Sequence, residues 1–299
     1  MNKQIDKSRS ALLATAGFAT IFGFSFMASR IALLHTTAPM LLVIRFSVSM
    51  FVMLLLVVFG VFKVSLKGKP IGRFLLMGFC QPVIYFMGET LGIQYTNSSF
   101  SGIMISLIPV STAIMSAIFL RERIKLRTML WIICTIIGVF VLSFAQTSSG
   151  SIQVKGILYL LVAVVSASAF YILSRQTVEH FTPFERTFIM IVMGFAFFTG
   201  QALIVEGSRF LPLLKAGITD SAVMIPILYL SVLSSVVAFL LQNYAVTYLE
   251  LAKITVFENI IPVISVAAGV IFLGEPFSLI QFAGIALILL GVWKVTTDD

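Results

Sequence analysis

Long apolar stretches separated by short polar breaks dominate the pattern of this chain. Each stretch is about 20 residues long, the length that a helix needs to cross roughly 30 Å of hydrocarbon. Breaks such as Thr182-Pro183 and Gly274-Glu275-Pro276 favour turns between the stretches. The pattern therefore predicts an all-α integral membrane protein with ten transmembrane helices. The predicted spans, numbered 1 to 10 in chain order, are 11–34, 40–62, 72–95, 98–120, 127–146, 155–176, 184–206, 222–247, 252–273 and 277–296.

One long segment of the chain occurs twice. Residues 88–139 align without a gap to residues 241–292, at an offset of 153. Because five spans separate the copies, the second copy crosses the membrane in the opposite direction. Secondary transporters are commonly built from such inverted repeats, with the substrate site at the repeat interface near the bilayer midplane. We therefore predict a five-helix repeat over 11–146 and an inverted five-helix repeat over 155–296.

Composition and charge agree with a membrane protein. Hydrophobic residues make up 59% of the chain and charged residues 11%, whereas soluble domains carry about 25% charged residues. Of the Lys and Arg residues, 15 lie on the side that holds both termini and only four, Arg30, Lys155, Arg209 and Lys215, lie on the other side. The positive-inside rule then predicts that both termini are cytoplasmic. This placement in short loops indicates a lipid bilayer around the protein and argues against nucleic acid as a partner.

The sequence lacks the familiar signatures of enzymes and ATPases. It contains no HExxH, no Walker lysine loop and no GxSxG. Cys80 and Cys134 lie in apolar stretches, and we interpret them as small core residues, without metal-ligand spacing. The basic start of the chain precedes an apolar stretch without a small-residue cleavage site, which favours a first transmembrane helix over a removable signal peptide. We expect no metal, no cofactor and no use of ATP.

Polar residues inside the spans are the candidates for a substrate site, because burying them in a membrane is costly. Gln81, Tyr85 and Glu89 recur at every fourth position of span 3, which places them on one helical face. We interpret this stripe as the lining of a cavity, and the alternative is a hydrogen-bonded seam between packed helices.

Span 9 carries a carboxyl group close to a proline. Pro262 in mid-helix would free the carbonyl of Glu258, which is followed by Asn259. A carboxylate beside an unpaired carbonyl can bind a cation, a substrate amine or a proton. The alternative is a neutral Glu258 buried in a packing network.

Other spans add neutral polar groups to the candidate site. These are Ser25, Tyr171, Gln242 and Asn243. Packing seams are the alternative explanation for small hydroxyl residues, and interfacial anchoring is the alternative for tyrosines near helix ends. We predict a central cavity lined by spans 1, 3, 4, 6, 8 and 9, with the two halves rocking about it.

A comparison of the two copies distinguishes positions that serve the fold from positions that serve function. Matched positions are interpreted as scaffold: Pro109 and Pro262 as helix kinks, Gly138 and Gly291 as packing positions, and Glu122 and Glu275 as caps of the helix that follows each. Glu89 aligns with Gln242 and Glu258 with Ile105, so these unmatched carboxyls are the stronger functional candidates. Arg45 is expected to form an outer-leaflet ion pair with Glu89, and the alternative is snorkelling to the headgroups.

The segments PVSTAIMSAIFLRERIKLRTMLWIICTIIGVFVL and PVISVAAGVIFLGEPFSLIQFAGIALILLGV resemble the ends of the two EamA units of the drug/metabolite transporter superfamily. The segment FGFSFMASRIALLHTTAPMLLVIRFSVSM, which contains Arg45, resembles the opening of the first unit. The resemblance covers nearly the whole chain. The chain departs from the family pattern at Arg121. The pattern around Arg45 in the first unit is missing from the start of the second unit, around Phe184–Ile191.

This resemblance implies an inner-membrane permease that works by alternating access without ATP. Members move amino acids, other metabolites or toxic compounds, often as exporters driven by the proton gradient. We therefore expect a secondary transporter of small molecules such as amino acids or amines, acting as an exporter. Glu89 or Glu258 would bind the coupling proton or a cationic group of the substrate. The alternatives are an intramembrane enzyme acting on lipid or peptide and a non-transporting sensor or scaffold. The sequence leaves open whether the protein forms a homodimer.

Overall fold

The computed structural model describes residues 2–119, 126–148, 152–175, 178–249, 254 and 257–297. Within these residues the protein is built from helices, without a strand. Eight helices are long and apolar enough to cross a membrane, and two shorter apolar helices, Ile260–Leu273 and Leu279–Lys294, complete a ten-helix layout. The prediction of an all-α membrane protein with ten helices is confirmed.

Several spans consist of more than one helical segment. The first repeat contains α1 (Asn2–Leu33), α2 (Ala38–Val58), α3 (Ile71–Gly78), η1 (Phe79–Ile84), α4 (Tyr85–Tyr95), α5 (Ser98–Ile105), α6 (Ile108–Phe119) and α7 (Leu126–Ser148). The second repeat contains α8 (Val154–Arg175), α9 (Pro183–Glu206), η2 (Gly207–Arg209), α10 (Phe210–Thr219), α11 (Ser221–Leu228), η3 (Tyr229–Ala238), α12 (Phe239–Tyr248), α14 (Ile260–Leu273) and α15 (Leu279–Thr297). The additional helix α10 lies where the sequence predicted only a connecting loop.

The two repeats are interlaced. Span 1 (α1) packs against α12, η3 and α14 of spans 8 and 9, and span 6 (α8) packs against α4, α5 and α6 of spans 3 and 4. We call these two groups of helices the 1-8-9 cluster and the 3-4-6 cluster, and α5 of span 4 also packs against α1 and α14, so it connects the two clusters. Each cluster combines helices of both repeats, so the repeats are not separate packing units. A rocking motion of one sequence half against the other would require separate units.

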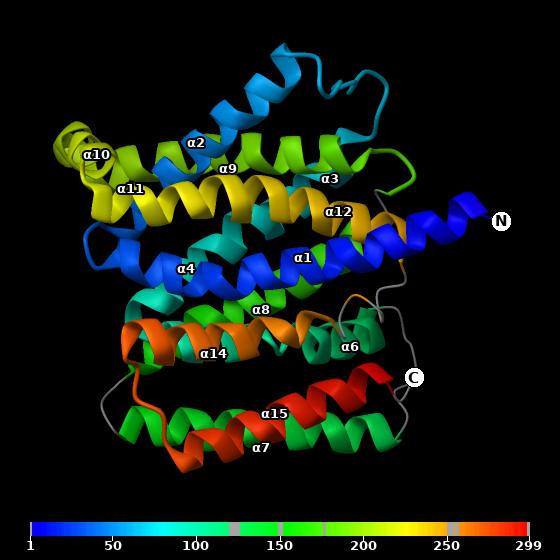
Figure 1. The fold of residues 1–299 in the computed structure, drawn as a ribbon, viewed down its shortest axis with the longest axis vertical. Coiled ribbons are helices and arrows are strands. Elements are labelled where there is room, and N and C mark those ends of the chain that lie inside the picture. Colours follow the sequence, from blue (N-terminus) through cyan, green and yellow to red (C-terminus); the bar gives the residue numbers. More distant parts are fainter. Residues whose placement is uncertain are drawn as a thin grey trace.

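Two further features of the arrangement follow from Figure 1. Helix α1 begins and α15 ends at the same end of the bundle, as an even number of spans requires. Helices α7 and α15 pack side by side along one edge. A Cβ atom on Gly138 would lie 2.9 Å from Cγ1 of Ile288 and 3.0 Å from the carbonyl oxygen of Gly284. Gly138 thus permits the close approach of these helices, in agreement with a scaffold role.

Spans 3 and 8 each contain an irregular segment, at corresponding positions of the two repeats. Both η1 and η3 are π-helical, and an offset of 153 places Phe79–Ile84 within Tyr229–Ala238. In η1 the backbone of Gln81 is extended (φ −137°, ψ 113°) next to Pro82. The regular helical spacing assumed for Gln81, Tyr85 and Glu89 is therefore interrupted. Such π segments occur frequently at functional sites, because they change the direction of side chains.

Pro109 and Pro262 lie at helix starts. Span 4 breaks at Ser106-Leu107, and Pro109 is the second residue of α6. A turn at Asn259 precedes α14, in which Pro262 is the third residue. Each span is therefore interrupted two or three residues before its proline, and the proline lies at the start of a helical segment and not in its middle. A proline in the first turn of a helix removes an N–H group that has no intrahelical partner, so the position tolerates it.

Glu275 holds a helix of the other repeat. Its Oε1 accepts hydrogen bonds from the backbone N–H and the hydroxyl of Ser98, at 2.8 and 2.7 Å. Its Oε2 accepts from the backbone N–H of Ser99 at 2.9 Å and from the Ser99 hydroxyl. Glu275 therefore caps α5, and the prediction that it caps the following helix is wrong. Its matched residue, Glu122, lies outside the described residues.

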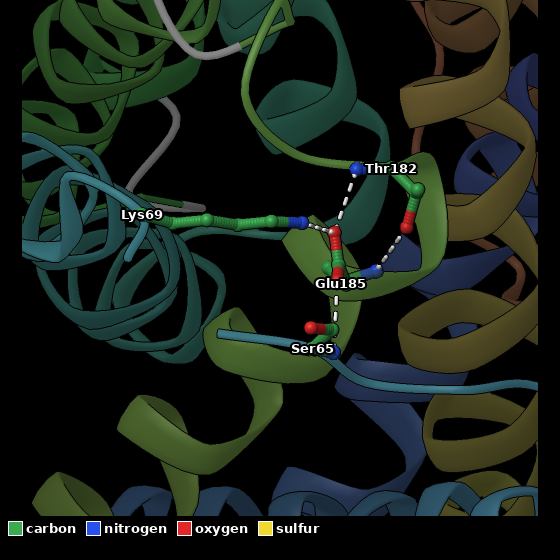
Figure 2. A network of polar contacts seen from close by, with 4 residues as sticks. All are labelled: Ser65, Lys69, Thr182 and Glu185. Carbon is green, nitrogen blue, oxygen red and sulfur yellow. Dashed lines mark hydrogen bonds and ion pairs between the residues drawn. The ribbon is translucent and has the colours of Figure 1, made fainter. Parts of the chain in front are cut away.

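Glu185 links the repeats where α9 begins (Figure 2). Its carboxylate accepts hydrogen bonds from the backbone N–H of Ser65 (3.0 Å), the ammonium of Lys69 (2.6 Å) and the backbone N–H of Thr182 (2.9 Å). The hydroxyl of Thr182 in turn accepts from the N–H of Glu185, which completes a capping box. One carboxylate thus caps α9 and attaches the loop between spans 2 and 3 to it.

Candidate functional site

A cavity lies between the two helix clusters. It contains about 630 Å³ of empty space, a volume that includes its opening to solvent. Its lining comes from spans 1, 3, 4, 6, 8 and 9, the six spans to which the sequence analysis assigned it. The cavity is therefore bounded by both repeats.

Eight of the nine polar residues predicted for the site line this cavity. They are Ser25, Gln81, Tyr85, Glu89, Tyr171, Gln242, Glu258 and Asn259. Pro109 lines it as well, whereas Pro262 is not among its lining residues. The break in span 4 and the turn before α14 position the backbone of both spans at the cavity.

Asn243 lies apart from the others, outside the cavity lining. Its side-chain amide donates to the hydroxyl of Thr187 at 3.0 Å, and its backbone carbonyl accepts from Arg186 at 2.6 Å. Arg186 also donates to the hydroxyl of Thr247. The 15 Lys and Arg residues assigned to the side of the termini include Arg186, but Arg186 is fully buried and is not a loop charge. These groups attach span 7 to span 8.

Sequence reasoning missed several lining residues that the repeat itself could have identified. At the offset of 153, Gln81 corresponds to Ser234 and Phe86 to Phe239, and all four line the cavity. Asn259 corresponds to Ser106 in the same way. Both members of the unmatched pairs Glu89/Gln242 and Glu258/Ile105 line it too. The cavity is thus built from corresponding positions whose side chains have diverged.

A chain of hydrogen bonds orients Glu258. The amide nitrogen Nε2 of Gln242 donates to the hydroxyl oxygen of Tyr171 at 2.6 Å, and that hydroxyl donates to Oε1 of Glu258. All three side chains are buried. Since Tyr171 has one hydroxyl proton and gives it to Glu258, Gln242 has to present its amide as a donor. This chain connects spans 8, 6 and 9.

Glu89 is held within its own helix. The hydroxyl of Tyr85 donates to Oε1 of Glu89 at 2.9 Å, one helical turn away. Both side chains are buried and line the cavity. The site therefore contains two tyrosine–glutamate pairs, one in α4 and one between α8 and the residues before α14.

Arg45 does not form the expected ion pair with Glu89. Its Nε donates to Ser235 at 2.8 Å and its Nη2 to Ser234 at 3.0 Å, and its guanidinium lies 4.2 Å from the ring centroid of Phe86. The alternative of snorkelling is also wrong, because only 1% of Arg45 is exposed. Serine hydroxyls on η3 provide the partners, and Glu89 interacts with Arg45 only through space.

The lining combines acidic, neutral polar and aromatic groups. No Lys, Arg or His is among the described residues that line the cavity. The aromatic residues of the lining are Phe22, Phe26, Tyr85, Phe86, Tyr171 and Phe239. The described part of the chain contains no group of three or more His, Cys, Asp or Glu residues placed to hold a metal ion. This chemistry suits the reversible binding of a small organic molecule.

Comparisons with known proteins agree with this architecture. The chain is 29% identical over 292 residues to an uncharacterized transporter of Bacillus subtilis, YcxC, covering 94% of this chain and 91% of that protein. It is 23% identical over 283 residues to a probable amino-acid metabolite efflux pump of Salmonella typhimurium, covering 91% and 90% of the two chains. A solved crystal structure has the same fold, with a TM-score of 0.70 at 16% identity, covering 97% of this chain and 96% of that one.

The family model described as the EamA-like transporter family matches residues 9–144 and 154–297. These two matches cover both repeats and nearly the whole chain. The protein is therefore a multi-pass membrane protein that belongs to the EamA-like transporter family.

Proposed function

We propose that the protein is a secondary transporter that exports small metabolites across the cell membrane by alternating access. The observation that carries this proposal is the cavity between two interlaced helix clusters, lined by corresponding positions of an inverted repeat. Transporters of this architecture bind their substrate at such an interface and expose it to the two sides in turn. Without a phosphate-cradling loop in the sequence, the driving force is an ion gradient, for which protons are the proposed carrier.

Amino acids, amines and related compounds are the proposed substrates. The relative from Salmonella typhimurium is a probable amino-acid metabolite efflux pump, which supports this class and the export direction. In the cavity, Glu89 or Glu258 would bind the coupling proton or a cationic group of the substrate. Gln81, Tyr85, Gln242, Asn259, Tyr171 and Ser25 would supply neutral hydrogen bonds.

The proposed orientation has both termini in the cytoplasm. The excess of Lys and Arg on the side of the termini supports it, through the positive-inside rule. In a variant without native cysteines, a cysteine replacing exposed Lys67 should be protected from a membrane-impermeant maleimide in intact cells. A cysteine replacing exposed Ser208 should react. The opposite labelling would reverse the orientation.

Solute counterflow in proteoliposomes tests the transport function. Purified wild-type protein should accelerate the entry of a labelled amino acid or amine into vesicles preloaded with the same compound. Exchange of both Glu89 and Glu258 for Gln should abolish the flux, whereas Asp220→Asn should keep it. Asp220 is exposed and caps α11, and Asn is an equally good cap. Flux that is unaffected in the double variant would refute the role of the carboxyls.

A further inference from the structure

We infer that the compound bound in this cavity is an organic cation, an ammonium group attached to an apolar or aromatic body. The inference rests on the proposed transport function and narrows its substrates from amino acids and amines to amines. It follows from the hydrogen-bonding groups that the protein itself leaves without partners, from the distribution of charge around the cavity, and from its aromatic lining.

Two buried acceptor oxygens at the cavity have no partner in the described structure. The carboxyl groups of Glu89 and Glu258 add further acceptors, and each receives a tyrosine hydroxyl on Oε1. Oε1 of Gln242 and Oε1 of Gln81 are buried without a partner, although both side chains are about 95% buried or more. For Gln242 this orientation is imposed by Tyr171, which needs the amide as a donor.

Unpaired buried acceptors favour a ligand that brings donors. Leaving a buried polar group without a partner costs about 1–3 kcal/mol, so a ligand that supplies the missing bonds gains from each. An ammonium group is a compact cation with several N–H donors and no acceptor. A carboxylate ligand would place further acceptors against the same oxygens. The unpaired groups therefore select for a donor-rich head group.

The charges around the cavity also favour a cationic ligand. The nearest buried cation, Arg45, is engaged by Ser234 and Ser235 and interacts electrostatically with Glu89. Glu258 has no such counterpart, because its only hydrogen-bond partner in the described structure is the neutral Tyr171. A negative charge on the buried Glu258 is costly unless a cation accompanies it. The substrate can be that cation.

The aromatic lining accommodates the rest of the molecule. Rings such as Phe22, Phe26 and Phe239 provide apolar surface, and their faces attract a cation within about 6 Å of the centroid. A zwitterionic amino acid would in addition need a cationic partner for its carboxylate, and the described lining contains none. We therefore expect the cavity to discriminate between ligands by charge.

Four ligands with the same aromatic body and different charges test the inference. Phenethylamine is a cation, phenylalanine a zwitterion, phenylpropionate an anion and phenethyl alcohol is neutral at pH 7. Binding to the purified full-length wild-type protein, measured by calorimetry in nanodiscs, should be at least about tenfold tighter for the amine than for each of the others. Weaker or absent binding of the amine, or tighter binding of phenylalanine or phenylpropionate, would overturn the inference.

Variants then assign the selectivity to Glu258. Glu258→Gln keeps an oxygen that can accept from Tyr171, so the cavity retains its shape. It should weaken amine binding at least about tenfold and leave the alcohol unchanged, whereas Asp220→Asn should change neither. Equal loss for amine and alcohol would indicate a general packing defect and contradict the charge role.

Failure of this inference can be distinguished from failure of the transport proposal. Counterflow of phenylalanine or phenylpropionate without binding of the amine would refute the cation class and keep the transporter. Tight amine binding without counterflow of any of the four ligands would support the cation site and refute transport of this class.

Discussion

Tyr171 donates a hydrogen bond to Glu258 across 87 positions of the chain, and this bond joins the two helix clusters. Tyr171 belongs to the 3-4-6 cluster through α8, whereas Glu258 and Gln242 belong to the 1-8-9 cluster. The Tyr85–Glu89 pair, by contrast, lies within one helix. A motion that separates the clusters would break the first pair and preserve the second. The two carboxyls of the cavity are therefore not equivalent.

Replacement of Tyr171 by Phe should destabilise the protein and weaken ligand binding. The change removes the hydroxyl that Glu258 accepts from and leaves the amide of Gln242 without its acceptor. A hydrogen bond to a charged group contributes about 1.5–3 kcal/mol, so the loss should appear as a lower melting temperature. Tyr159→Phe, in the same helix, is the matched control, because its ring stacks on Tyr95 without a hydrogen bond from its hydroxyl in the described structure. Equal melting temperatures for the two variants would contradict the prediction.

A charge swap between Arg45 and Glu89 should not restore function. Arg45→Glu is expected to be damaging, because it removes the hydrogen bonds to Ser234 and Ser235 and the contact with the ring of Phe86. Adding Glu89→Arg cannot recreate these contacts. Arg45→Lys keeps the charge but loses the planar guanidinium, and we expect a loss of about 1 kcal/mol of stability from it. Counterflow and melting temperature measure both effects, and recovery in the swapped protein would re-establish the direct ion pair.

Capping of α5 by Glu275 should require that position 269 carry no side chain. A Cβ atom on Gly269 would overlap Oε2 of Glu275 and the hydroxyl of Ser99. Gly269→Ala should therefore lower the melting temperature nearly as much as Glu275→Ala, which leaves several donors unpaired. Gly200→Ala is the control, since Gly200 is also helical and nothing lies within 4 Å of an added Cβ. If Gly269→Ala matched Gly200→Ala, the cap would be unimportant for stability.

The network around Glu185 should stabilise the junction between span 7 and the loop after span 2 (Figure 2). Glu185→Ala leaves the N–H groups of Ser65 and Thr182 and the ammonium of Lys69 without their acceptor. We expect a loss of about 2–3 kcal/mol, seen as a lower melting temperature.

The contribution of Lys69 alone should be smaller, about 1 kcal/mol or less, because 24% of its side chain is exposed and the ion pair is partly screened. Lys69→Met measures this contribution. Lys67→Met, two residues earlier at an exposed position, provides the control. A larger loss for Lys67→Met than for Lys69→Met would exclude the ion pair as the cause.

Much of the candidate site could be predicted from the sequence by comparing the two copies of the repeat. Glu89 and Glu258 stood out because their counterparts are Gln242 and Ile105, and all four line the cavity. Asn243 was equally polar and one residue further along, yet it faces Thr187 and Arg186. A shift of one residue turns a side chain by about 100° around a helix, and the π segment of span 8 changes this direction again. Sequence spacing alone could not assign the direction.

The sequence by itself determined the number of spans and their inverted duplication. Hydrocarbon excludes unpaired backbone groups, so helices with their internal hydrogen bonds suit the crossings, and apolar stretches of about 20 residues make these visible locally in the sequence. The tertiary structure alone decided that the repeats interlace and that Glu275 caps Ser98 and Ser99. It also decided that Arg45 binds serines of span 8. These partners are far apart in the chain, and a buried polar group accepts whichever partner packing brings within hydrogen-bond distance.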